Sequence, residues 1–159
     1  MSFSLNFSDV MAGLNNLSKL TPQMCDRAVG KAGSRVLRDS IMEMPTVPLD
    51  EGTLRGSGSV CVMGQSAPVV TGAQFGHAVG TPIQNAGPKP GGDSVAVISF
   101  NTPYATYQHE GQRQDGSHKV LEYSEPSSGA KFLEQPMLTN AKRYGQIMAE
   151  SLQKDLSRA

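Results

Sequence analysis

The feature that most constrains the fold of this chain is one long apolar repeat near its start. Between residues 22 and 44, apolar side chains recur at spacings of three and four, which is typical of an α-helix with one buried face. Thr21 suits the N-cap and Pro22 the first helical position, while Pro45 prevents continuation. A shorter repeat of the same kind precedes this one, so the sequence predicts helical structure over 8–44 with a break near Thr21.

Four runs further along the chain have the composition of β-strands. Residues 59–63 are rich in β-branched side chains, and residues 119–123 also favour a strand. Residues 94–100, with the sequence SVAVISF, are apolar on nearly both faces, which predicts the central strand of a sheet. Residues 69–71 permit a further short strand. The rest of 45–129 is rich in turn-forming residues, so we expect loops there.

The last segment has a second amphipathic helix pattern, over 134–157. Pro136 stands in its first turn, where proline is tolerated. Its apolar stripe consists of Met137, Ala141, Tyr144, Met148 and Leu152, widened by Leu138, Ile147 and Leu156. Helices at both ends with a small, mostly antiparallel sheet between them predict an α+β fold. We expect one domain over 1–159, divided into a helical part (8–44), a sheet with loops (45–129) and a C-terminal helix (130–159).

Residues 64–93 differ from the rest of the chain because they contain seven Gly and four Pro. So long a stretch without regular structure is unusual inside a compact domain. Its composition cannot support a core of its own, so we expect an extended, arm-like loop that orders against a neighbouring subunit or another protein. The apolar anchors of this arm are expected to be Val69, Val70, Phe75 and Val79.

No catalytic, metal-binding or cofactor-binding pattern is visible in the sequence. His109 and Glu110 could begin the zinc-protease motif HExxH, but Arg113 stands where the second His is required and Gly111 breaks the helix. The phosphate-binding pattern GxxxxGK(S/T) and the nucleophile pattern GxSxG are both missing. We therefore expect a protein without enzymatic activity, cofactor or metal.

The charge balance argues against a general nucleic-acid binder. The chain has 14 basic and 14 acidic residues, whereas proteins that hold phosphates are usually basic. Cys25 and Cys61 form no CxxC pair, which favours free thiols in a reducing compartment. Neither a signal pattern nor an apolar stretch of membrane-spanning length occurs, so we expect synthesis in a cytoplasm and no membrane partner.

Three stretches, taken in order, resemble phage tail-completion and minor capsid proteins of the group typified by gene product 10 of phage HK97. Residues 45–57 (PTVPLDEGTLRGS) look like the segment that joins the long N-terminal helix of that family to its first strand. Residues 103–111 (PYATYQHEG) are similar to the segment after its central strand, where we expect a turn or short helix that ends at Gly111. Residues 130–137 (AKFLEQPM) resemble the opening of its C-terminal helix.

The resemblance implies a structural virion protein of the head–tail neck, made in the cytoplasm of the host bacterium. Such subunits form rings, often six-fold, around the DNA channel. The implied partners are other copies of the chain and other neck, connector and tail proteins, with channel DNA met only indirectly. The residues of these motifs that are candidates for assembly contacts are Arg55, Tyr104, Tyr107, His109 and Glu110.

Three other interpretations stay open at this point. The first is a tail-terminator or head-closure ring, which is a different position in the same particle. The second is a small DNA-binding module, which the acidic middle of the chain disfavours because phosphate binding needs Lys and Arg on one face. The third is an enzyme whose catalytic residues the sequence does not reveal.

Overall fold

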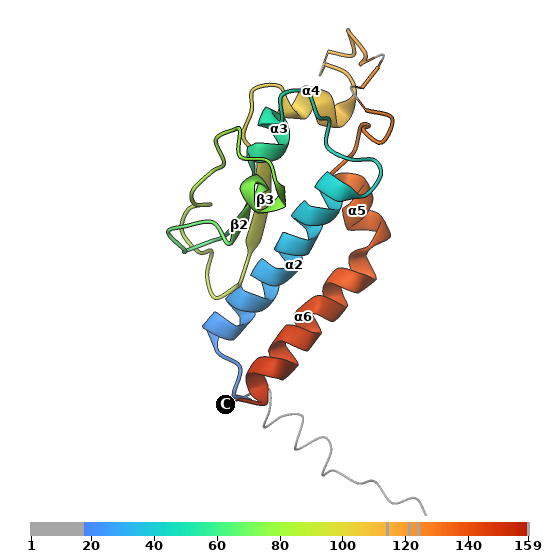
Figure 1. Cartoon of the computed structure of the whole chain (residues 1–159). Helices are drawn as coiled ribbons and strands as arrows, with labels where there is room; N and C mark the ends of the chain where they lie inside the picture. The colour runs from blue at the N-terminus through green and yellow to red at the C-terminus, as the bar shows by residue number, and fades with distance from the viewer. Residues whose placement is uncertain (1–17, 114, 121, 124, 159) are drawn as a thin grey trace, which may run out of the picture.

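The computed structural model describes residues 18–158, apart from 114, 121 and 124. It confirms the predicted α+β fold, with helices at both ends of the chain and a small antiparallel sheet between them. In Figure 1, α6 runs alongside α2, and α2 lies between α6 and the sheet. The elements are α2 (Pro22–Met42), α3 (Thr53–Gly56), β1 (Gly58–Val62), β2 (Val70–Thr71), the 3-10 turn η1 (Gly72–Phe75), β3 (Ala96–Phe100), α4 (Ala105–Glu110), α5 (Glu134–Thr139) and α6 (Ala141–Leu156).

α2 begins where the sequence predicts. The Thr21 hydroxyl oxygen accepts a hydrogen bond from the Met24 amide at 3.3 Å, which caps the first turn. On the side of α2 that faces the sheet, a Cβ added at Gly33 would lie only 2.7 Å from a Val60 methyl group. Glycine at this position therefore lets the helix approach the central strand closely, and both surfaces lose contact with water.

The apolar stripe of α2 ends earlier than predicted. The helix stops at Met42 and the next residue, Glu43, is already extended. As a result Met44, at the end of the predicted apolar repeat, is 74% exposed. The shorter helix expected before Thr21 lies almost wholly outside the described residues, which begin at Ser18.

The strand order is β2-β1-β3, with both neighbouring pairs antiparallel. The prediction that 94–100 forms the central strand is wrong, because β3 is an edge strand and every one of its residues is only half-buried. β1 is central and buried along its whole length, since it has a strand on each side and a cover on each face. The short strand allowed at 69–71 is confirmed by β2.

Two other predicted elements differ in the structure. The described residues of 119–123 form no strand, and Lys119 makes only an isolated bridge with Gln112. The single helix predicted over 134–157 is divided into α5 and α6 at Asn140, whose ψ of 14° is not helical. Because of this break, Met137 and Leu138 of the predicted stripe point to solvent, whereas Tyr144 is buried against α2.

Residues 64–93 fold back over the sheet and do not extend away as an arm. Val60 faces α2, so Ser59 and Cys61 point to the opposite face, yet both are at most 1% exposed. The Cys61 thiol lies 3.5 Å from the carbonyl oxygen of Ile83, which belongs to the covering segment. The part of the segment around Ile83 therefore lies over the face of the sheet opposite α2.

A buried carboxylate, Asp39, joins α2 to α6. It is 0% exposed, and the Tyr144 hydroxyl donates a hydrogen bond of 3.0 Å to one of its oxygens. The guanidinium of Arg35 lies 2.7 Å from the other oxygen. Burial, and then the Asp39 carboxylate, raise the pKa of Tyr144 to about 12. The interface therefore holds Tyr144 in its neutral form.

The close packing of residues 72–80 on α3 predicts that Gly56→Ala is strongly destabilising. An added Cβ would lie 1.6 Å from the Val79 carbonyl oxygen, and backbone on both sides must move to relieve the clash. We expect the free energy of unfolding in urea to fall by at least about 2 kcal/mol. In the control Gly145→Ala, nothing lies within 4 Å of the new methyl group. Because alanine favours a helix more than glycine does, Gly145→Ala should raise the free energy of unfolding by about 0.5–1 kcal/mol. An equal change in both variants would contradict the close packing at Gly56.

The raised pKa of Tyr144 predicts a loss of stability at high pH. Below pH 10 the tyrosine is neutral in both states, so its contribution is fully present. Between pH 10 and 12 the unfolded chain loses the proton first, which should lower the free energy of unfolding by about 2–3 kcal/mol. Tyr144→Phe should abolish this part of the pH dependence in urea titrations, whereas Tyr104→Phe, at an exposed position, should keep it.

Candidate functional site: a candidate assembly surface

The three segments that carry the family resemblance meet at one end of the domain. Residues 45–57, 103–111 and 130–137 lie far apart in the sequence, but α3, α4 and α5 lie at the same end of the molecule in Figure 1. We call the end formed by these three segments the three-segment end. It contains several of the predicted contact residues, so it is the candidate assembly surface.

Phe132 connects the three segments through the core. It is 1% exposed and is the largest of the fully buried side chains among the described residues. The centre of its ring lies 4.9 Å from that of the His109 imidazole and 5.3 Å from that of the Phe100 ring, and both pairs of rings are nearly perpendicular. Val47 and Leu54, from the first segment, belong to the same buried cluster. One side chain of the third segment therefore contacts β3 and α4 and closes the core shared with the first segment.

Arg55 fixes the first segment from inside. Its guanidinium donates hydrogen bonds to the Val47 carbonyl oxygen at 2.7 Å and to the Glu125 carboxylate at 2.6 Å. A longer contact of 3.4 Å reaches the Thr46 hydroxyl. The sequence indicated a planar fork suited to a carboxylate or a carbonyl, and Arg55 uses both kinds of partner within its own chain. Since Arg55 is only 7% exposed, it positions the surface and does not form part of it.

A charged cluster holds α4 against the start of α5. Glu110 pairs with Lys131 at 2.6 Å and with the His109 ring nitrogen Nδ1 at 2.9 Å, and Lys131 also reaches Glu134 at 2.9 Å. Hydrogen bonds from Lys131 and His109 lower the pKa of Glu110, and those from Glu110 and Glu134 raise the pKa of Lys131. Glu110, Lys131 and Glu134 are each about 40–50% exposed at the side chain, so these ion pairs contribute little to stability.

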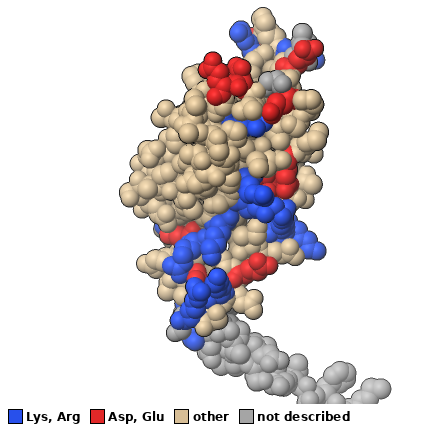
Figure 2. All heavy atoms as spheres, viewed as in Figure 1, with Lys and Arg blue, Asp and Glu red and all other residues tan. Residues whose placement is uncertain are grey.

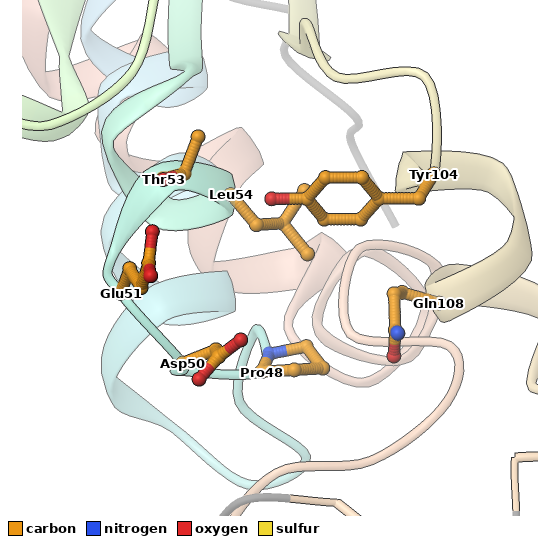
Figure 3. Close-up of a pocket in the computed structure, with 7 residues that line it drawn as sticks. All are labelled: Pro48, Asp50, Glu51, Thr53, Leu54, Tyr104 and Gln108. Carbon is orange, nitrogen blue, oxygen red and sulfur yellow. The ribbon is translucent and has the colours of Figure 1, made fainter.

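The outer surface of the three-segment end has a small hollow between α3 and α4, drawn in Figure 3. Its volume is about 110 Å³, well below the roughly 300 Å³ at which metabolite sites begin. The Tyr104 ring reaches from α4 across Leu54, and the carboxylates of Asp50 and Glu51 stand at the rim on the α3 side (Figure 3). A hollow of this size and charge can receive one side chain of another protein, and a basic one best.

The other predicted contact residues are divided between surface and interior. Val69 and Val79 are exposed, at 43% and 56%, whereas Val70 and Phe75 are half-buried and pack against the core. Tyr107 is half-buried in α4. The outer edge of β3 is not among the predicted contact residues, because residues 94–100 were expected to form the central strand.

Figure 2 shows that basic side chains gather over the lower half of this face, with some acidic side chains among them. Lys and Arg lie over the lower part of α2 and α6, where Arg27, Lys31, Lys154 and Arg158 surround a shallow hollow. Arg27 is paired there with Asp155 at 3.0 Å, and Lys31 donates to Ser151 at 2.9 Å. The ion pair with Asp155 neutralises Arg27, which weakens this hollow as a phosphate-binding site.

Within the part of the chain that the structure describes, no group of three His, Cys, Asp or Glu side chains could hold a metal ion. None of the described helices has both the length and the apolar character needed to cross a membrane. Comparisons with protein-family models, curated proteins and solved structures find no match to this chain.

The buried position of Arg55 predicts that Arg55→Met destabilises the domain. The Val47 carbonyl would lose its charged donor in a buried position and Glu125 would lose its partner. We expect the free energy of unfolding to fall by about 2–4 kcal/mol. The control Arg38→Met, at an exposed position of α2, should change it by less than about 0.5 kcal/mol. A matching small effect at both positions would show that Arg55 does not hold the three-segment end.

Proposed function

We propose that this chain is a structural subunit of a tailed-phage particle and assembles as a ring in the neck between head and tail. The observation that carries the proposal is the convergence of the three family-like segments at one end of the domain, around Phe132 and Arg55. Their convergence gives the three segments one common surface that a partner could contact. The chain is then made in the cytoplasm of the host bacterium and acts in the virion.

For this function the three-segment end needs a fixed conformation and an outer surface that can bind another protein. Buried contacts of Phe132 and Arg55 fix the loops, so little conformational entropy remains to be lost when a partner binds. Tyr104 is 41% exposed, and Asp50 and Glu51 carry two negative charges beside it. An exposed tyrosine flanked by carboxylates is suited to protein contacts, because its ring gives apolar area and its hydroxyl gives a hydrogen bond.

A ring requires two different surfaces on each copy. The hollow with Asp50 and Glu51 and the hollow lined mainly by basic side chains of α2 and α6 are separate and differ in charge. A contact between unlike surfaces repeats from copy to copy, and closure of the ring makes weak individual contacts cooperative. Opposite charges also guide the correct orientation during association.

This function predicts a specific defect when the gene is disrupted. Electron microscopy of lysates should show filled heads beside separate tails, because the joint between them is not completed. Normal joined particles in the disruptant would exclude the neck role. Complementation refines the test: a gene with both Asp50→Lys and Glu51→Lys should restore joined particles poorly, whereas Asp93→Lys, an exposed acidic position outside the hollow, should restore them fully.

A further inference from the structure

The outer edge of β3 has backbone groups without a partner among the described residues. β1 is the one strand beside β3 in this sheet. The flanking bonds, Met63 N–H to the Val95 carbonyl and Asn101 N–H to the Ser57 carbonyl, set the register of the ladder. In an antiparallel pair with this register, the N–H and C=O groups of residues 96, 98 and 100 point away from β1. No hydrogen bond between described residues reaches them.

A groove of about 240 Å³ lies beside residues 98–100 at this edge. It is lined by Ile98, Ser99 and Phe100 of β3, by Ala105, Thr106 and His109 of α4, and by Phe132 and Leu133. No Asp, Glu, Lys or Arg lines it. The groove therefore combines an open row of backbone donors and acceptors with an uncharged and largely apolar wall, which is the combination that an added β-strand requires.

The chain itself contains a segment that fits this groove. Residues 2–7 read SFSLNF, so that Phe3, Leu5 and Phe7 alternate with small polar side chains. This period of two is typical of a strand with one apolar face, and the segment contains no charged side chain. With six residues, the segment is long enough to pair with all five residues of β3. Alternate apolar side chains would lie beside the side chains of residues 96, 98 and 100, on one face of the sheet.

We infer that residues 2–7 of one copy add as a β-strand to the outer edge of β3 in a neighbouring copy, with Phe3, Leu5 and Phe7 in the groove. The contact is between unlike surfaces and can therefore repeat around a ring. The choice of a neighbouring copy, over the same copy, rests on the proposed ring. The strand pairing supplies affinity through backbone hydrogen bonds, and the apolar side chains set its register.

The test uses the full chain and sedimentation over a wide range of concentrations. Wild type should self-associate, and Leu5→Ser should weaken the association constant at least about tenfold, because it removes an apolar side chain from the groove. Asn6→Ser, which changes the opposite face of the segment, should associate within about twofold of wild type. Both substitutions lie outside the residues that the structure describes, so neither alters a contact that it records.

A second variant tests the receiving edge. Proline is tolerated in an edge strand where the N–H faces outward, so Ile98→Pro removes a donor from the open edge and keeps the ladder to β1. It should weaken association about tenfold or more, whereas Ile98→Val, which keeps the N–H, should not. If Ile98→Pro fails to fold, the comparison of Leu5→Ser with Asn6→Ser still tests the strand addition.

Hydrogen exchange at the Ile98 amide separates the remaining outcomes. Slower exchange in the associated state than in the dilute state supports strand addition between copies. Association of Leu5→Ser at the wild-type strength would overturn the inference, and so would a monomer whose Ile98 amide exchanges freely. A monomer with a protected amide would mean that the segment binds its own copy. Joined particles after gene disruption would refute the neck role and leave these results unchanged.

Discussion

The burial of Phe132 is the contact on which the rest of the functional end depends. Removing a side chain of this size from water contributes about 2–3 kcal/mol, a sizeable part of the roughly 5–15 kcal/mol of a whole domain. Its cluster includes Leu37 and Ile41 of α2, so the end of the molecule is anchored to the longest helix. The start of α5 is therefore positioned by the packing of Phe132 in the core. The same contact fixes the conformation of the loop that precedes α5.

The sheet is too small to be stable unless both faces are covered. Three strands, one of them two residues long, bury little by themselves. α2 covers one face at a distance that Gly33 permits, and the stretch around Ile83 lies over the other. The ion pair of Lys89 with Asp26, at 2.6 Å, links the covering segment to α2. The segment thus contributes to the core of the domain although its composition suggested an arm.

The sequence predicts those features that depend on local chemistry. The cap at Thr21, the strand at 59–63 and the helix end at Gly111 are all recognisable from short-range signals, and the structure confirms each. Features that depend on partners far away along the chain could not be predicted from the sequence. The edge position of β3 depends on which strand pairs with which, and Arg55 finds Glu125 seventy residues away. At the candidate site, the exposed Tyr104 agrees with the sequence, whereas the internal role of Arg55 follows only from its neighbours.

The open edge of β3 bears on assembly for a reason independent of any one partner. Natural sheets protect their edges with charged side chains, proline, bulges or a covering segment, because unpaired edges otherwise pair with other chains. β3 has the sequence AVISF, which contains no charge and no proline. Residues 64–93 cover a face of the sheet, and the groove beside β3 stays open among the described residues. An edge without protection is a liability in a monomer, but it is the expected form of a surface that another strand completes.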